Sequence, residues 1–305
     1  MPYKWHPENS LYDSMLMWRM LDITESNGGK IDLVIGTKFP SYGAIHSNKV
    51  AWVIHQFRQV YDLFKTSHGL SHAEHGIEMK KRVENFDEIS MGECKNIFTI
   101  SNNVSARLLK YNGINSKPLY HPPSMAGRYI CEDYSDYILS VGRLDRLKRN
   151  ELLLRSLCYC DKKIKVKIVG RGPEMENLKD LAVEYKVAKR VEFMGFVSND
   201  DLLQLYSNAF AVFFAPVDED YGYVTLESFF SRKPIVTCKD SGGVLEFVED
   251  GANGYVCGSS PQEIGAAINE LYCEKNKCKI LGEMGYDKVK DITWDNVIER
   301  LTQTL

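Results

Sequence analysis

Two glutamates, Glu219 and Glu227, stand eight residues apart in the segment APVDEDYGYVTLES (215–228). A carboxylate accepts two hydrogen bonds side by side, which matches two adjacent hydroxyl groups of a sugar or a ribose. Two such carboxylates near the end of a strand can hold two rings of one sugar nucleotide. Asp218 and Asp220 lie in the same segment and allow a different interpretation, in which they hold a divalent cation against a diphosphate.

Two cations in the segment GRLDRLKR (142–149) follow directly after the apolar run YILSVG (137–142). One is Arg143, whose guanidinium can bind a phosphate in a bidentate way, and the other is Lys148, whose ammonium acts as a mobile point charge. Two cations fixed just past a strand end suit a diphosphate, which carries charge on both of its phosphates.

Two turns that contain glycine are expected beside these charges. Gly242 and Gly243 precede an expected helix, whose free backbone N–H groups attract an anion, and glycine lets that anion approach closely. Gly170 and Gly172 lie in VGRGPEMENL (169–178) and match the start of a dinucleotide fingerprint, but the third glycine is missing. We therefore interpret this segment as a strand–helix turn that flanks a nucleotide base.

The histidines offer two further candidates. His68, His72 and His75 have the i, i+4, i+7 spacing of one helix face, which would suit a metal ion. Glycines next to His68 and His75 weaken such a helix, so no metal site is expected there. His55 ends the apolar run VAWVIH (50–55), where by its position alone it is a strand-end residue of the core.

The elements that position these residues are clearest in the second half of the chain. Apolar runs typical of buried parallel strands alternate there with amphipathic helical segments, and the expected strands are YILSVG (137–142), VKIVG (166–170), RVEFMGF (190–196), AVFFAP (211–216) and PIVTC (234–238). Five such alternations imply a parallel sheet that is covered on both faces. Ligands of such a sheet bind at the carboxyl ends of its strands, which is where the candidate loops begin.

The first half is also α/β, but it begins with an expected helix, SLYDSMLMWRMLDI (10–23). Three strands are expected to follow, IDLVIG (31–36), VAWVIH (50–55) and NIFTIS (96–101). A nucleotide-type domain normally opens with a strand and a glycine-rich turn, whereas here Asn27-Gly28-Gly29 precedes a strand. The segment that carries proline and glycine at 121–136 is the expected linker between two domains.

Composition excludes several classes of function. With 44% hydrophobic and 26% charged residues the chain is globular, and it shows neither a membrane-spanning run nor a secretory signal. Its eight cysteines have no disulfide or zinc spacing, which fits a reducing cytoplasm. The net charge of −3 argues against a nucleic-acid partner. The first 130 residues contain 15 Lys+Arg against 12 Asp+Glu, so peripheral contact with an anionic lipid surface is left open.

Taken in order along residues 95–304, these motifs resemble glycosyltransferase family 4, the retaining sugar-nucleotide transferases of GT-B fold. The segments that carry the resemblance are FTISNNVSARLLKYNGI, GRLDRLKR, IVGRGPEMENL, VEFMGFVSNDDLLQLYSNA, EDYGYVTLES, KPIVTCKDSGGVLEFVEDGANGY and ITWDNVIERL. The most specific of them is the Glu219–Glu227 pair with Gly222 inside it, which occurs together with GRLxxxK upstream and SGG downstream.

The resemblance implies roles for individual residues. Arg143 and Lys148 would clamp the donor diphosphate, Glu219 would contact the donor sugar, Glu227 would contact the ribose, and His55 would face the donor sugar. The other residues expected to bind the donor nucleotide and sugar are Gly222, Tyr223, Val224, Gly242, Gly243, Gly170, Arg171 and Val197. No metal and no cofactor are expected, because the nucleoside-diphosphate sugar is itself the donor substrate and the two cations supply the positive charge.

The implied architecture is an α/β GT-B fold of two Rossmann-like domains that face a cleft. An abbreviated N-terminal, acceptor-side domain is expected over 1–130, without the usual first strand and glycine-rich loop. A nucleotide-sugar-binding domain is expected over 131–290. The segment 291–305 is expected to form an amphipathic helix that packs back on the N-terminal domain.

The implied function is retaining, metal-independent transfer of a sugar from a nucleoside-diphosphate sugar, UDP- or GDP-linked, in polysaccharide biosynthesis. The acceptor would be a glycan, a lipid-linked sugar or a protein-linked sugar, and the place would be the cytoplasm or the inner membrane face. The alternative is a non-catalytic sugar-nucleotide-binding subunit that partners an active transferase, which the missing N-terminal loop supports. A metal-dependent GT-A enzyme is a poorer match, because that fold is essentially one domain. A partner chain or an oligomer is left open.

Overall fold

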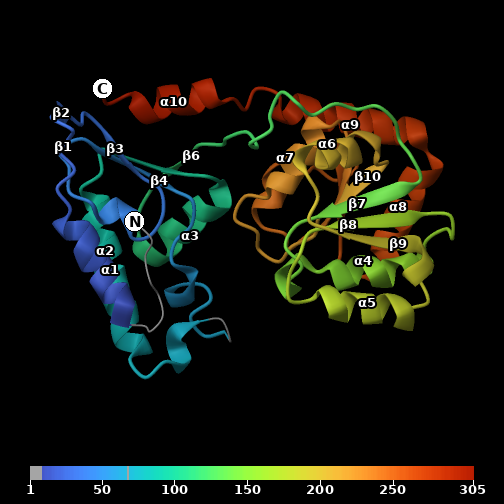
Figure 1. Cartoon of the computed structure of the whole chain (residues 1–305), viewed down its shortest axis with the longest axis horizontal. Helices are drawn as coiled ribbons and strands as arrows, with labels where there is room; N and C mark the ends of the chain where they lie inside the picture. Colours follow the sequence, from blue (N-terminus) through green and yellow to red (C-terminus); the bar gives the residue numbers. More distant parts are fainter. Residues whose placement is uncertain (1–8, 67–68) are drawn as a thin grey trace. The chain divides into compact units, whose positions relative to one another are not determined.

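The computed structural model of the chain describes residues 9–66 and 69–305, and Figure 1 shows its helices and strands. The chain divides into two compact units. Unit 1 contains the described residues up to His121 together with Thr293–Leu305, and unit 2 contains Pro122–Ile292. The division falls at the start of the expected linker, before the boundary that the sequence suggested at 130/131.

Unit 1 is built on a parallel sheet with the strand order β3-β4-β5-β6. These strands are β3 (Val34–Gly36), β4 (Lys49–Val53), β5 (Asn96–Thr99) and β6 (Lys117–Pro118), and the helices of the unit are α1 (Asn9–Met20), α2 (Gly76–Gly92), α3 (Asn102–Asn112) and α10 (Trp294–Thr302). Short 3-10 helices cover Ser41–Gly43, Arg58–Val60 and Leu70–His72. The strands expected at 31–36, 50–55 and 96–101 are therefore present, in shortened or shifted form.

A separate hairpin of β1 (Glu25–Ser26) and β2 (Gly29–Lys30) explains the Asn-Gly-Gly sequence. Asn27 and Gly28 have φ angles of 51° and 77°. Two consecutive left-handed residues are what a tight type I′ hairpin turn needs, and Asn-Gly is the pair that adopts them most readily. These residues consequently shape a surface turn.

The histidine spacing does not produce the single helix face that it suggested. His72 ends a 3-10 helix, and His75 stands just before α2, so the two side chains belong to different elements. His68 lies outside the described residues. Within residues 9–66 and 69–305, no group of three or more His, Cys, Asp or Glu side chains is arranged to hold a metal ion.

Helix α10 belongs to unit 1 although it is remote in sequence from the rest of that unit. Its Val297 and Leu301 are buried, as the amphipathic pattern requires. The Trp294 ring stands edge-on to Trp52 of β4, with ring centroids 6.3 Å apart. This aromatic contact and the two aliphatic side chains attach the C-terminal helix to unit 1.

A buried cation connects α1, the first 3-10 helix and β4 in unit 1. Lys49 is fully buried, and its ammonium donates hydrogen bonds to the carbonyl oxygens of Tyr42 and Ala44 and to the Glu93 carboxylate, at 2.9, 3.0 and 2.8 Å. Arg19 of α1 binds both oxygens of the same carboxylate at 2.7 Å. These bonds, with that to Arg19 the largest cause, lower the pKa of Glu93 to about 2. A buried ammonium needs such a counter-charge, because burying it alone is very unfavourable.

Unit 2 is a six-stranded parallel sheet with the order β12-β11-β10-β7-β8-β9. The strands are β7 (Tyr137–Val141), β8 (Lys165–Val169), β9 (Val191–Gly195), β10 (Ala211–Phe213), β11 (Ile235–Cys238) and β12 (Gly254–Cys257). The helices are α4 (Asn150–Ser156), α5 (Met175–Glu184), α6 (Asn199–Asn208), α7 (Tyr223–Phe230), α8 (Pro261–Cys273) and α9 (Lys275–Val289). Figure 1 shows α4 and α5 on one face of this sheet and α6, α7 and α9 on the other, so its strands are buried on both sides.

The order of the strands in unit 2 reverses between β7 and β10. The chain builds outward from β7 to β8 and β9, and then returns to place β10 on the other side of β7. In an open parallel sheet, the loops at such a reversal part and leave a crevice at the carboxyl ends of the two strands. The loops after β7 and β10 are those that carry the candidate cations and glutamates.

Two features of unit 2 differ from expectation. The α-helix expected after Gly243 is a single 3-10 turn, Gly243–Glu246, and a sixth strand, β12, follows where none was expected. The segment GYVC is too short and too close to glycines to stand out as a strand in the sequence. In the described part of the chain, none of the helices has both the length and the apolar character needed to cross a membrane.

The Lys49–Glu93 contact predicts an acid-sensitive contribution to the stability of unit 1. The pKa of Glu93 is lower in the folded chain than in the unfolded chain, so its contribution is complete above the unfolded pKa and disappears as the pH falls toward about 2. We expect Glu93→Gln to lower the free energy of unfolding at pH 7 by about 2–3 kcal/mol, because the buried ammonium loses its counter-charge. Urea denaturation of the full chain measures this.

The exposed Glu88 of α2 provides the matched control. Glu88→Gln should change the unfolding free energy by less than about 0.5 kcal/mol. The difference between wild type and Glu93→Gln should shrink at pH 3. A difference that is the same at pH 7 and pH 3 would show that Glu93 is not the counter-charge of Lys49.

Candidate functional site

Lys148 and Glu219 meet at the reversal of the unit 2 sheet. Lys148 lies in the loop after β7 and Glu219 in the loop after β10, and the Lys148 ammonium donates to the Glu219 carboxylate in an ion pair. Their side chains are 23% and 22% exposed, so each still has access to solvent. The Phe214 ring lies beside the ammonium, 5.4 Å from its centroid. The structure thus brings together a cation and a carboxylate that the sequence had assigned to the same ligand.

Arg149 fixes the loops around this ion pair, and the sequence analysis did not identify it. Its guanidinium donates to the carbonyl oxygens of Ala215 and Pro216 at 2.6 and 3.0 Å, and to both carboxylate oxygens of Asp240 at 2.9 and 2.7 Å. It therefore joins the loops that follow β7, β10 and β11. In the sequence Arg149 directly follows Lys148, and nothing distinguishes it from another basic side chain exposed to solvent.

The two glycines after β11 have a structural role against the Glu219 loop. The Gly243 N–H donates to the carbonyl oxygen of Glu219 at 2.7 Å, and the Glu219 N–H donates to that of Ser241 at 3.3 Å. A Cβ atom on Gly243 would lie 2.5 Å from the carbonyl oxygen of Asp220, so only glycine fits. The Gly243 N–H is thus engaged by the Glu219 loop in this structure, and the expected role of the two glycines toward an anion stays a prediction. Gly242, with φ 61°, forms the turn before Gly243.

Glu227 is positioned by a different environment from that of Glu219. It lies on α7, and the residue before this helix, Gly222, has a left-handed backbone conformation. The Glu227 carboxylate accepts a hydrogen bond from the Tyr206 hydroxyl at 2.6 Å. Tyr206 is fully buried, and the buried Tyr129 hydroxyl lies beside the same carboxylate. Burial raises the pKa of Glu227, and the Tyr206 hydrogen bond opposes that shift. The tyrosine thus holds one oxygen of a carboxylate that is poorly solvated.

The other expected donor-binding residues of unit 2 occupy the same edge of the sheet. Gly170 follows β8, and a Cβ atom on it would lie 1.8 Å from the carbonyl oxygen of Gly142, so the loops after β7 and β8 are packed against each other. Arg171 is exposed and lies 6.0 Å from the Phe196 ring, one residue before Val197. Arg143 is 73% exposed, with Asp145 at 3.7 Å.

Two residues next to Gly222 have different surroundings. The Tyr223 side chain is 46% exposed, and its ring stands edge-on to the buried Tyr221 at 5.3 Å. Val224 is buried. A Cβ atom on Gly222 would lie 2.8 Å from the Val244 side chain, so a glycine is needed where α7 starts.

His55 lies in unit 1, two residues after β4 ends. Its Nδ1 is 2.8 Å from the carbonyl oxygen of Gln56, which restricts the ring. The Gln56 side chain in turn donates to Asn112 of α3. Within unit 1, therefore, the His55 loop is fixed to α3.

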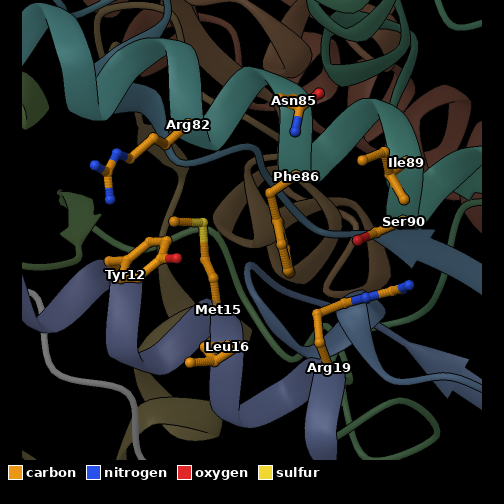
Figure 2. Close-up of a pocket in the computed structure, with 9 residues that line it drawn as sticks. All are labelled: Tyr12, Met15, Leu16, Arg19, Arg82, Asn85, Phe86, Ile89 and Ser90. Carbon is orange, nitrogen blue, oxygen red and sulfur yellow. The ribbon is translucent and has the colours of Figure 1, made fainter.

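The pocket in Figure 2 is separate from all of these residues. It has a volume of about 220 Å³, lies between α1 and α2 of unit 1, and is lined by apolar side chains such as Leu16, Phe86 and Ile89. Its two cations are already paired, Arg19 with Glu93 and Arg82 with Glu78. The described residues that line it include the Ser90 hydroxyl but no histidine or carboxylate that could act as its base, so the pocket lacks the cation–carboxylate pair found at the strand ends.

A parallel sheet with helices on both faces, and a strand reversal at which a cation and a carboxylate meet, is the arrangement of a doubly wound α/β protein, a class that binds its ligands at such a reversal. The comparisons with known proteins specify the family. The model for glycosyl transferases group 1 matches residues 132–288, half of the chain. The chain therefore belongs to that family, and its two α/β units have the GT-B fold.

The curated relatives are matched only in part. The chain is 30% identical over 170 residues to an uncharacterized glycosyltransferase of Methanocaldococcus jannaschii, a match that covers 54% of this chain and 43% of the relative. It is 30% identical over 117 residues to the alpha-1,3/1,6-mannosyltransferase ALG2 of Dictyostelium discoideum, covering 38% and 28%. The chain thus spans less than half the length of these two relatives.

Solved structures agree on the fold over nearly the whole chain. HepE of Anabaena, in complex with UDP, superposes with a TM-score of 0.70 at 16% identity and covers 97% of this chain and 81% of its own. The sucrose-phosphate synthase of Thermosynechococcus elongatus gives a TM-score of 0.72 at 17% identity, covering 89% and 72%. At this identity the likeness establishes the fold alone.

The Tyr206–Glu227 contact predicts a pH-dependent effect of removing one hydroxyl group. Because the folded-state pKa of Glu227 is raised, ionising it costs stability as the pH rises above the unfolded pKa, and the Tyr206 hydrogen bond reduces that cost. Tyr206→Phe should therefore lower the free energy of unfolding at pH 7 by about 1.5–3 kcal/mol. Below pH 4, where the carboxyl is protonated in both states, the loss should be smaller.

Tyr137→Phe is the matched control. The Tyr137 hydroxyl donates to the carbonyl oxygen of Leu205 at 2.8 Å, which does not titrate. Losing this hydrogen bond should lower the free energy of unfolding by about 1 kcal/mol both at pH 7 and at pH 4. If Tyr206→Phe had the same cost at pH 4 and pH 7, the hydroxyl would not be stabilising an ionised Glu227.

Proposed function

We propose that the chain is a retaining glycosyltransferase that moves a sugar from a nucleoside-diphosphate sugar to a sugar acceptor without a metal ion. The observation that supports this most is the Lys148–Glu219 ion pair at the strand reversal of unit 2. A diphosphate needs a cation there and a sugar needs a hydrogen-bond acceptor, and this pair supplies both. UDP or GDP is the proposed nucleotide, and HepE, which is seen with UDP and with UDP-glucose, supports the first of these.

The ion pair between Lys148 and Glu219 matters for the binding of a negatively charged diphosphate. A bare Glu219 carboxylate would repel an incoming diphosphate, but its ion pair with Lys148 neutralises much of that repulsion. The Lys148 ammonium also orients the Glu219 carboxylate, and a carboxylate is a group that can accept hydrogen bonds from sugar hydroxyls. Arg143, which is mostly exposed, adds a second cation from the same loop.

In the proposed reaction, the bond between C1 of the donor sugar and the diphosphate oxygen breaks, and negative charge grows on the leaving diphosphate. Lys148 and Arg143 stabilise that charge, which is the largest contribution a site of this kind can make. The acceptor hydroxyl enters on the face that the diphosphate leaves, and its proton passes to a diphosphate oxygen. No protein nucleophile takes part. Glu219 orients the sugar and Glu227 the ribose.

The alternative is a non-catalytic subunit that binds a sugar nucleotide and partners an active transferase. It is favoured by unit 1, where none of the loops after β3, β4 and β5 in the described residues is glycine-rich. If the chain is a glycosyltransferase, the proposed acceptors are a glycan, a lipid-linked sugar or a protein-linked sugar. The two hypotheses agree on the donor site and differ only in turnover.

Calorimetry on glutamate variants tests the donor site. Glu227→Gln should weaken the binding of UDP or GDP about ten- to a hundredfold, because the ribose loses a charged acceptor worth roughly 1.5–3 kcal/mol. Glu219→Gln should weaken the nucleoside-diphosphate sugar more than the free diphosphate, because its partner is the sugar. Glu176→Gln, at an exposed position on α5, is the control and should change neither affinity. Equal losses for both ligands in both variants would contradict the assignment.

A transfer assay separates the two hypotheses. We expect the full chain, with UDP- or GDP-linked sugars and a mixture of oligosaccharide acceptors, to release nucleoside diphosphate at a rate that EDTA leaves unchanged, because cations of the protein occupy the position of a metal. Tight donor binding without transfer or hydrolysis would favour the non-catalytic subunit. Activity that EDTA removes and manganese restores would instead favour a metal bound at Asp218 and Asp220.

A further inference from the structure

Asp87 of α2 is a fully buried carboxyl group in the core of unit 1. Its Oδ1 accepts a hydrogen bond from the Tyr42 hydroxyl and its Oδ2 accepts one from the Tyr61 hydroxyl, both at 2.7 Å. Tyr42 belongs to the first 3-10 helix, and Tyr61 lies in the loop after β4 (residues 54–66). Both tyrosines are buried. The carboxyl group therefore joins α2 to two segments that are distant from it in the sequence.

A line of hydrogen bonds leads from Tyr61 to the start of the loop after β4. The Asn112 side chain, at the end of α3, donates from Nδ2 to the Tyr61 hydroxyl oxygen at 2.9 Å. The buried Gln56 side chain donates from Nε2 to Asn112 Oδ1. Gln56 follows His55, and its carbonyl oxygen is 2.8 Å from His55 Nδ1. Asp87 is thus connected through three side chains to the residue beside His55.

The ionised form of Asp87 fixes the direction of every bond in this line. A carboxylate has no hydrogen to donate, so both tyrosine hydroxyls must donate to it. The Tyr61 oxygen then accepts from its other neighbour, and Asn112 has to turn its NH2 group toward it. The Asn112 carbonyl oxygen consequently faces Gln56, which presents its own NH2 group. One charge in the core thereby decides how two amide side chains are oriented.

A second contact holds the loop after β4 at a different point. The Asp62 carboxylate pairs with Arg58 of the same loop at 2.6 Å and lies 3.8 Å from Arg107 of α3. This contact fixes the part of the loop around Asp62, whereas the line of hydrogen bonds holds the part around His55. Breaking the line should therefore loosen the loop locally and leave unit 1 folded.

We propose that Asp87 is a positioning residue that, through this line of hydrogen bonds, holds the end of the loop that carries His55. In a parallel sheet, ligands bind at the carboxyl ends of the strands, and His55 follows β4 at that end. The benefit to catalysis rests on the proposed function, in which His55 faces the donor sugar. The order of the loop does not, because it follows from hydrogen bonds within unit 1.

The charge on Asp87 changes within the physiological range of pH. Burial raises the pKa of Asp87 to about 7, and the hydrogen bonds from Tyr61 and Tyr42 oppose that shift. Glu84 of the same helix raises the pKa further, although it is paired with Lys80. Asp87 therefore takes up a proton as the pH falls through about 7. Its new hydrogen changes what Tyr61 has to donate or accept, and the change should reach the next side chain in the line.

The side-chain NH2 signals in 1H–15N correlation spectra of the full chain test this link. Between pH 8 and pH 6, the Asn112 signals of the wild-type chain should shift with a midpoint near 7. Tyr61→Phe removes the hydroxyl between Asp87 and Asn112, so the shift should largely disappear. Tyr42→Phe is the matched control, because it removes the other hydrogen bond to the same carboxyl group and should leave the shift in place. Asn112 signals that do not move in the wild-type chain, or that move as much in Tyr61→Phe, would overturn the proposal.

Hydrogen exchange measures whether the loop itself is held. The Val60 N–H donates to the carbonyl oxygen of Phe57 inside the loop at 3.0 Å, so its exchange reports local opening. At pH 8, Tyr61→Phe and Asn112→Ala should each speed this exchange about five- to tenfold, as expected for the loss of one hydrogen bond. Tyr42→Phe should leave it unchanged. Exchange at the wild-type rate in the first two variants, or an equal rise in both tyrosine variants, would show that the line does not hold the loop.

A transfer assay on the same variants separates this inference from the proposed function. Neither the spectra nor the exchange rates depend on a donor or on turnover. Tyr61→Phe and Asn112→Ala should lower kcat about tenfold, while the affinity for UDP stays the same, because the proposed nucleotide site lies in unit 2. An equal loss of kcat in Tyr42→Phe would indicate general destabilisation and contradict positioning. A wild-type chain without transfer activity would contradict the proposed function, and the spectra and the exchange rates would still decide the role of Asp87.

Discussion

The reversal of strand order between β7 and β10 is the constraint on which the candidate site depends. It places the loop that carries Lys148 next to the loop that carries Glu219, although the two residues are far apart in the sequence. The reversal alone does not set their distance. Arg149 does so, because its guanidinium binds the loops after β10 and β11 from the end of the loop after β7. The site is therefore a consequence of the topology, and one partly buried arginine holds its loops together.

Three buried charges elsewhere in the chain show how differently such groups can be stabilised. Lys49 has a carboxylate partner, Glu93, and is a structural ion pair. Glu227 has a neutral partner, the Tyr206 hydroxyl, which holds one oxygen of a poorly solvated carboxyl group whose pKa burial raises. Lys233 is held by the carbonyl oxygen of Asp133, the Cys131 sulfur and the Tyr134 ring, and the negative charge of Asp133 also acts on it. The first arrangement joins opposite charges in direct contact, whereas the other two place an ionisable group mainly against neutral partners.

The sequence predicted those parts of the fold that depend on local pattern. The strands of unit 2 were found because long apolar runs in a parallel sheet are distinctive, and the family was found because Glu219, Lys148 and the SGG turn occur in order. It missed β12, which is short, and it expected an α-helix where Gly243 starts a single 3-10 turn. It also missed Arg149, because the groups it binds come from loops that only the folded sheet brings together. The roles given to the site residues remain predictions.

A crystal structure of the full chain with UDP or GDP tests the central claim most directly. The account predicts that the diphosphate lies at the carboxyl ends of β7 and β10, with Lys148 and Arg143 in contact with phosphate oxygens and the ribose hydroxyls on Glu227. It also predicts no metal ion between the phosphates and Asp218. A nucleotide bound elsewhere, or a diphosphate at the strand reversal that leaves Lys148 paired only with Glu219, would contradict it.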